Sequence, residues 1–168
     1  MSEQIFVIED GILTKFECDD YVEAVYIPDC VKSIGEKSFF EAAVGKVVLS
    51  DSVTTIEPDA FLDCTLSEIE IPNSVTTIQT WAFNGCENLQ SIMIPESVTS
   101  IGPWAIGYRE LQFLPYWDPI PFGKPVIIYG KKGSEAERYT KENNWCYNKH
   151  ITEFREIETN TEKQEGEL

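Results

Sequence analysis

The chain of 168 residues is poor in the groups that enzymes and nucleic-acid-binding proteins commonly use. It has one histidine, His150, and 13 Lys and Arg against 29 Asp and Glu, which gives a formal charge of −16. A single histidine cannot build a poly-histidine metal site, and no nucleophile or orienting acid is indicated beside it. The excess negative charge repels phosphate backbones and anionic lipid. We therefore expect no enzyme activity, no cofactor, no nucleic-acid partner and no membrane partner.

Long apolar runs are also absent, and the first residues lack the pattern of an export signal. The opening segment, MSEQIFVIEDG, has acidic residues where a signal peptide has basic ones. No stretch approaches the length of a transmembrane helix. As written, the chain is expected in the cytoplasm. The alternative is an extracellular or cell-surface protein from which an export signal has been removed.

The five cysteines lack the spacing of a metal knuckle, and an odd number cannot all pair within one chain. We interpret them as reduced thiols. Cys64 and Cys86 take equivalent places 22 residues apart, which leaves a disulfide or a thiolate pair as the alternative. Small buried side chains are the favoured interpretation, because cysteine is among the most buried residue types.

The sequence does contain one motif, called the phrase below, that is repeated four times. The copies begin at Asp29, Asp51, Asn73 and Glu96, and the third reads NSVTTIQTWAFNGC. A fixed period of this length predicts a solenoid, in which units too small to bury their own apolar side stack on one another. We expect three columns of the repeat to share the interior: Val31, Val53, Val75 and Val98; Ile34, Ile56, Ile78 and Ile101; and Phe39, Phe61, Phe83 and Ile106.

Each unit also carries an LxxIxI pattern that predicts a short strand before the phrase. Ile69 and Ile71 point to one face of such a strand, and Glu68 and Glu70 to the other. The residue that opens each phrase suits a turn; a calcium site along that column is the disfavoured alternative. A fifth strand copy is expected within the repeats of residues 22–116, at Leu111, Leu114 and Tyr116.

Both ends of a solenoid need caps, because a terminal coil exposes strand edges and apolar side chains. Residues 1–21 predict an N-terminal hairpin that turns at Asp10 and Gly11. Residues 117–155 predict a C-terminal cap with a strand at VIIYG, a helix whose capping box is Ser134 and Glu137, and a last extended piece. Residues 1–155 thus form one domain, and residues 156–168 an acidic, loosely ordered tail. Trp117, Ile120 and Phe122 are expected to cover the open end or, alternatively, to extend the strand face.

The stretch SVTTIEPDAFLDCTLSEIEIPNSVTTIQTWAFNGCENLQSIMIPESVTSIG resembles the BspA-like branch of bacterial leucine-rich repeats, whose unit runs IPxSVTSIGxxAFxxCxxLxxI. The segments FVIEDGILTKF and IYGKKGSEAERYTKENN resemble the pieces that open and close such arrays in gut bacteria. The resemblance implies a leucine-rich-repeat solenoid: a right-handed superhelix of short parallel strands, mostly β, with short helical turns. It also implies a surface or secreted protein of the adhesin type as one functional alternative.

Outward side chains on the predicted strands leave apolar material on one face. Tyr26, Val48, Met93 and Phe113 flank the two acids Glu68 and Glu70. Aromatic residues and Met are enriched at contact surfaces, although such types also simply suit strands. We predict a non-enzymatic module that binds a protein or peptide, with the acids favouring a basic partner. The alternative is a structural scaffold with weak self-association.

Overall fold

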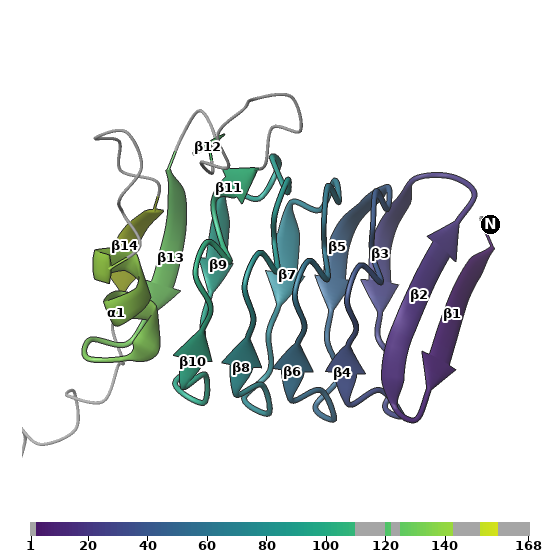
Figure 1. Ribbon diagram of the computed structural model, residues 1–168, viewed down its shortest axis with the longest axis horizontal. Coiled ribbons are helices and arrows are strands. Elements are labelled where there is room, and N and C mark those ends of the chain that lie inside the picture. The colour runs from purple at the N-terminus through teal and green to yellow at the C-terminus, as the bar shows by residue number, and fades with distance from the viewer. Residues whose placement is uncertain (1–2, 110–119, 122–124, 143–151, 158–168) are drawn as a thin grey trace, which may run out of the picture.

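The computed structural model describes residues 3–109, 120–121, 125–142 and 152–157. Figure 1 shows an elongated block made of two rows of short strands, with a hairpin at the N-terminal end and a helix at the other. This arrangement is the stacked solenoid that the 22-residue period predicts.

The first row is a six-stranded sheet that begins with the hairpin. Its strands lie in the order β1 (Gln4–Glu9), β2 (Ile12–Cys18), β4 (Ser33–Ile34), β6 (Thr55–Ile56), β8 (Thr77–Ile78) and β10 (Ser100–Ile101). β1 and β2 pair antiparallel, and every later pair is parallel. The register places the isoleucine column side by side, as expected from the repeat.

The second row consists of two three-stranded parallel ladders. One contains β3 (Val22–Tyr26), β5 (Val44–Val48) and β7 (Glu68–Glu70), and the other contains β9 (Ser91–Met93), β13 (Val126–Gly130) and β14 (Thr152–Glu156). The division falls where the repeat spacing rises from 22 to 23. The extra residue lies between Cys86 and Leu89, just before β9. A short antiparallel pair, β11 (Tyr108–Arg109) with β12 (Ile120–Pro121), stands apart from both rows.

The three predicted columns form the interior. All their members are buried, and the phenylalanine rings stack from coil to coil with centroids 4.8 Å apart for Phe39–Phe61 and 5.2 Å apart for Phe61–Phe83. The stack continues into the hairpin, because the ring of Phe16 lies 4.8 Å from that of Phe39. Burying a large apolar side chain stabilises the fold by about 1.5–3 kcal/mol, so this column is a main source of its stability.

Each coil bends at two backbone positions in the left-handed region. One column is Lys37 (φ 55°), Asp59 (53°), Trp81 (60°) and Trp104 (54°), and the other is Glu41 (53°), Asp63 (53°) and Gly85 (76°). In the last coil the second left-handed residue is Gly107 (86°), one position earlier in the repeat. Between them run turns closed by bonds such as Phe40 N–H to Lys37 O and Leu62 N–H to Asp59 O. These tight turns stand where the sequence predicted short helical turns, and α1 is the one helix in the described residues.

The predicted hairpin is confirmed. Asp10 (φ 51°) and Gly11 (φ 82°) are both left-handed, as a two-residue turn between twisted strands requires. Phe6 and Phe16 face each other across the pair and continue the apolar interior. The hairpin therefore covers the first coil with its own apolar side chains.

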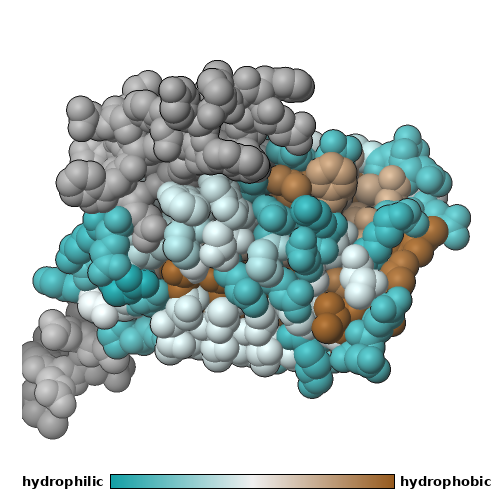
Figure 2. Space-filling view, viewed as in Figure 1, coloured by the Kyte–Doolittle hydropathy of each residue, from teal (hydrophilic) through white to brown (hydrophobic). Residues whose placement is uncertain are grey.

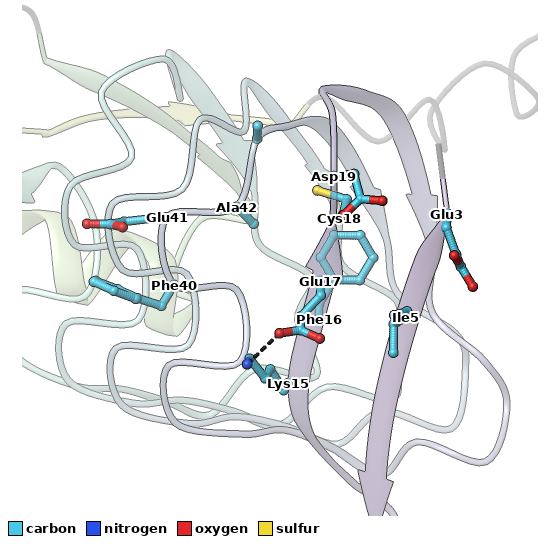
Figure 3. A pocket seen from close by; sticks show the side chains of 11 residues that line it. Glu3, Ile5, Lys15, Phe16, Glu17, Cys18, Asp19, Phe40, Glu41 and Ala42 are labelled. Carbon is cyan, nitrogen blue, oxygen red and sulfur yellow. Dashed lines mark ion pairs between the residues drawn. The ribbon is translucent and has the colours of Figure 1, made fainter. Parts of the chain in front are cut away.

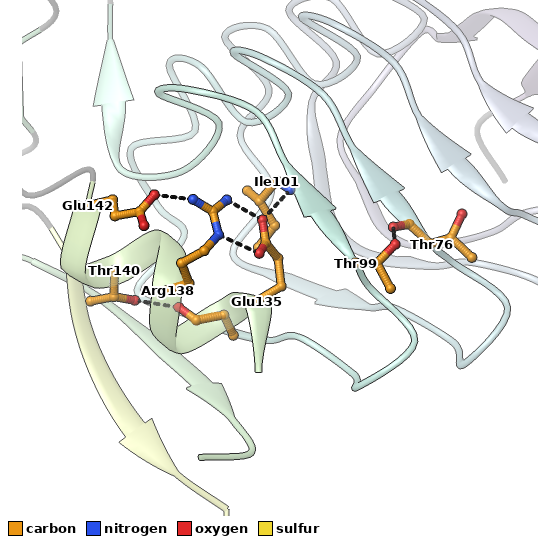
Figure 4. Close-up of polar contacts among 8 residues, drawn as sticks. Thr76, Thr99, Ile101, Glu135, Arg138, Thr140 and Glu142 are labelled. Atoms are coloured by element: carbon orange, nitrogen blue, oxygen red, sulfur yellow. Dashed lines mark hydrogen bonds and ion pairs between the residues drawn. The ribbon is translucent and has the colours of Figure 1, made fainter. Parts of the chain in front are cut away.

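The helix α1 (Glu135–Glu142) closes the other end, as predicted. The Glu135 carboxylate accepts the backbone N–H of Ile101 at 2.9 Å on the open edge of β10 (Figure 4). The Tyr139 hydroxyl accepts the N–H of Ile106 at 3.0 Å and donates to the carbonyl oxygen of the same residue at 3.3 Å. Pairing with the Arg138 guanidinium chiefly holds the pKa of Glu135 below its usual range. The helix thus makes hydrogen bonds to backbone groups that would otherwise pair with a further coil.

Three details of the C-terminal cap differ from the sequence prediction. Glu137 accepts the N–H of Gly133 at 2.7 Å, and the Ser134 hydroxyl makes no hydrogen bond in the described structure. Ser134 and Glu137 therefore do not form the reciprocal hydrogen bonds of the predicted capping box. β13 takes the place beside β9 that a fifth copy would fill; Leu111, Leu114, Tyr116, Trp117 and Phe122 lie outside the described residues. Glu156, which we placed in the tail, ends β14.

Candidate binding face

The outward side chains of β3, β5, β7, β9, β13 and β14 form the surface that we call the strand face. In its main row Tyr26 lies beside Val48 and Val48 beside Glu70; further along, Met93 lies beside Tyr129 and Tyr129 beside Arg155. Tyr26 is 68% exposed and Met93 is 56% exposed. Alternate residues of these strands are buried in the core, which is why the row projects outward.

The centre of the strand face carries three charges that partly cancel. The Lys46 ammonium lies 2.8 Å from Glu68 Oε1 and also pairs with Glu70. Hydrogen bonds to these two carboxylates raise the pKa of Lys46 above its usual range. The two acids that we expected to attract a basic partner therefore share one cation, and a single negative charge remains among the three groups.

The far half of the strand face includes residues that the sequence analysis did not select. Tyr129 takes the place next to Met93 that we assigned to Phe113, and Phe113 lies outside the described residues. Arg155 Nε donates to Glu153 Oε1 at 3.0 Å, and this bond is the main cause of the raised pKa of Arg155. Both strands were recognised in the sequence, and alternation along them was the signal that could have identified Tyr129 and Arg155 as outward side chains.

The cysteines of the repeat are structural. Cys64 and Cys86 are buried free thiols, as the favoured interpretation held, and the Cys86 thiol donates to the carbonyl oxygen of Phe61 at 3.1 Å. Burial raises the pKa of Cys64 to about 12 and raises that of Cys86 as well. Neutral thiols at these places are poor nucleophiles and poor metal ligands.

Other classes of site find little support in the part of the chain that the structure describes. No three His, Cys, Asp or Glu side chains there are grouped as metal ligands, and His150 lies outside it. Within the same residues, no helix is both long and apolar enough to span a bilayer.

A hollow of about 480 Å³ opens at the N-terminal end of the solenoid. It lies between the hairpin and the turn that follows Phe39 (Figure 3). Figure 2 shows apolar surface at this end of the molecule, where Ile5, Val7 and Ile12 of the hairpin are exposed. This hollow could not be predicted from the sequence, because it forms only when the hairpin packs beside the first coil.

Known families and solved structures agree with this architecture. The model of the BspA type leucine rich repeat region matches residues 14–121 in six copies, which is more than half of the chain. The chain belongs to the BspA-type leucine-rich-repeat family. Curated protein sequences give no match.

Solved structures of other bacterial proteins align with parts of this BspA-type domain, and the first of these supports its fold. The pneumococcal vaccine antigen PcpA aligns with 88% of this chain at 21% identity and a TM-score of 0.56. The T. pallidum leucine rich repeat protein aligns with 76% of this chain at 22% identity and a TM-score of 0.48, and the alignment covers 68% of the T. pallidum protein. A leucine-rich repeat protein from Bacteroides ovatus aligns with 66% of this chain at 25% identity and a TM-score of 0.44, and the alignment covers 39% of the B. ovatus protein. The chain spans 45% of the solved length of the pneumococcal antigen.

Proposed function

We propose that this BspA-type domain is a non-enzymatic module that binds a protein or peptide through its strand face. The observation that carries the proposal is the pair of large, exposed side chains, Tyr26 and Met93, on strands that are fixed by a packed core. Aromatic residues and Met are enriched where proteins make contacts, and a rigid scaffold lowers the entropy cost of binding. The solenoid thus supplies a preformed surface rather than a catalytic centre.

The arrangement of charge along the strand face suggests the chemistry of the partner. An apolar group of the partner would cover Tyr26 or Met93, and a basic group would lie near Glu68 and Glu70, which share one lysine and keep one negative charge between them. Tyr129 and Arg155 extend the same row and enlarge the area available for contact. The preference for a basic partner therefore depends on one charge, and most of the affinity would come from apolar contact.

A double substitution, Tyr26→Ser with Met93→Ser, tests the strand face. A photo-crosslinker at Val48 first identifies the bound protein by mass spectrometry in cytoplasmic and extracellular fractions, which also locates the domain. The affinity of the purified pair is then measured by calorimetry. Loss of a contact hot spot costs about 2 kcal/mol or more, so we expect affinity to fall at least about thirty-fold.

The matched control is Val7→Ser with Ile12→Ser, which removes exposed apolar groups from the hairpin instead. It should retain the affinity of the unmodified domain, and thermal unfolding should show that both variants are folded. Equal binding by the strand-face variant and the control would contradict the proposal.

A structural role as a self-associating scaffold is the second candidate. β1 is the outermost strand of the six-stranded sheet, and Ile5 and Val7 on it are exposed. Such an edge can pair with another chain. Sedimentation velocity over a wide concentration range tests this role: association that Val7→Lys abolishes would favour the scaffold, and a constant monomer would argue against it.

A further inference from the structure

The hollow at the N-terminal end is made of residues other than those of the strand face. Its lining comes from residues in and next to β1 and β2 and from the turn after Phe39 (Figure 3). We propose that this hollow binds an arginine side chain presented by an extended segment of a partner protein.

The apolar part of the lining suits the aliphatic stem of such a side chain. Phe16 and Ala42 are buried, and Phe40 and Ile5 remain 49% and 44% exposed. In Figure 3, Phe40 and Ile5 stand on opposite sides of β2. Three methylene groups can lie against such a surface while the charged head stays near water, and a guanidinium over an aromatic ring gains further attraction.

The charged part of the lining calls for a cation. Four carboxylates, from Glu3, Glu17, Asp19 and Glu41, stand against the single ammonium of Lys15, which lies 2.5 Å from Glu17 Oε1. The other three carboxylates form no ion pair with any described residue. A ligand with a positive charge would therefore neutralise groups that the fold leaves uncompensated.

The negative charge of the hollow also acts on a neighbouring carboxylate. Asp63 lies one coil beyond Glu41, at the equivalent left-handed position. Partial burial raises the pKa of Asp63, and the charges of Glu41 and Glu87 raise it further. Negative charge thus extends from the hollow along the adjoining turns, where it can steer a cationic segment toward the site.

Competing ligand classes fit this lining less well. An anion would be repelled, and a purely apolar group would desolvate carboxylates without pairing them. A metal ion needs a closer set of ligands, and the described residues contain no such group of three. Lysine offers a compact point charge, whereas the planar guanidinium can pair with a carboxylate in two places and stack on a ring. A volume of about 480 Å³ lies within the usual range for ligand sites and admits an arginine with part of its own chain.

Titration with small blocked peptides tests the site directly. The full chain is labelled with ¹⁵N, and amide shifts are followed on adding Gly-Arg-Gly, Gly-Lys-Gly or Gly-citrulline-Gly, the last being an uncharged match for arginine. We expect saturable shifts confined to residues 15–19 and 40–43 with the arginine peptide. Binding should be at least five-fold weaker with lysine and undetectable with citrulline.

Single substitutions then separate a built site from general attraction to an acidic protein. Phe40→Ala and Glu41→Gln should each weaken arginine binding at least five-fold, and both change exposed side chains, so the spectra should remain those of the folded domain. Asp51→Asn removes an exposed acid from a turn outside the hollow and should leave binding unchanged. Shifts spread over the whole acidic surface, or equal losses in all three variants, would overturn the proposal. So would saturable shifts at Tyr26 and Met93 instead, an outcome that would favour the strand face.

Discussion

At the scale of single residues, the repeat constrains backbone conformation more tightly than side-chain identity. Lys37, Asp59, Trp81 and Trp104 have little in common chemically, yet all four hold a φ between 53° and 60°. Residues with a Cβ atom adopt this region at a cost of about 1–2 kcal/mol. The fold tolerates that cost in each coil because the turn brings the next buried side chain into its column.

Replacing Lys37 by glycine tests this account of the turns. Lys37→Gly removes the steric cost of the left-handed backbone and gives up only an exposed ion pair with Glu36, whose atoms lie 3.8 Å apart. The free energy of unfolding in urea should rise by about 0.5–1 kcal/mol. The adjacent substitution Glu36→Gly is the control, because Glu36 has no positive φ and glycine there should destabilise the fold. Equal losses from both changes would contradict the strain argument.

The sequence predicted the buried residues of the repeat well, and for a physical reason. Residues 22 apart in a stacked coil meet the same neighbours, so an apolar column can only face the interior, as Val53, Ile56 and Phe61 do. The left-handed positions of the repeats were not predicted, because lysine, glutamate and tryptophan give no such conformational signal and a lone aspartate gives only a weak one. Within the repeats, glycine marks this conformation only at Gly85 and Gly107.

At the scale of elements, the C-terminal helix ends a row of backbone hydrogen bonds that runs from coil to coil. Within the repeats, the N–H of each buried phenylalanine donates to the carbonyl oxygen of an alanine one coil further on, as in Phe61 to Ala82 and Phe83 to Ala105, both at 2.9 Å. Ile106 in the last coil has no such neighbour. The Tyr139 hydroxyl takes the place of that alanine carbonyl.

Tyr139→Phe should therefore destabilise the whole domain although it removes one oxygen atom. The change leaves the buried N–H and carbonyl oxygen of Ile106 without the hydroxyl that bonds both. An unsatisfied buried polar group costs about 1–3 kcal/mol, and urea denaturation should show a loss in that range. Tyr26→Phe, at an exposed side chain, is the control and should have almost no effect. A loss no larger than the control's would mean that water replaces the hydroxyl.

The sequence predicted both capping elements but not their order in the ladder. Alternation around Asp10–Gly11 and the helical pattern near Ala136 and Tyr139 are local signals, and local signals identified each element. Which strand follows β9 depends on a long-range choice between residues near 111–116 and β13, and the chain makes that choice after a proline-rich stretch. Tyr129 therefore entered the strand face only through the structure.

At the scale of the whole molecule, a charge of −16 acts on the entire fold. Like charges repel more strongly in the compact state than in the unfolded chain. Ion pairs such as Lys131 with Glu96, at 2.8 Å, act in the opposite direction, but the lysine and glutamate side chains in this pair are more than half exposed and contribute little. Repulsion should therefore outweigh attraction, and this difference gives salt a predictable effect.

Raising sodium chloride from 10 to 150 mM should stabilise the domain. The screening length falls from about 30 Å to about 8 Å, which weakens repulsion across the molecule while neighbouring pairs persist. We expect a rise of about 2–4 °C in Tm by calorimetry, equivalent to about 1 kcal/mol for a chain of this size. A variant with Asp20→Asn, Asp29→Asn and Asp51→Asn removes three exposed charges, and asparagine suits the same turns. This variant should start with a higher Tm at low salt and gain less from added salt. A fall in Tm with salt would show instead that surface ion pairs dominate the electrostatics of the fold.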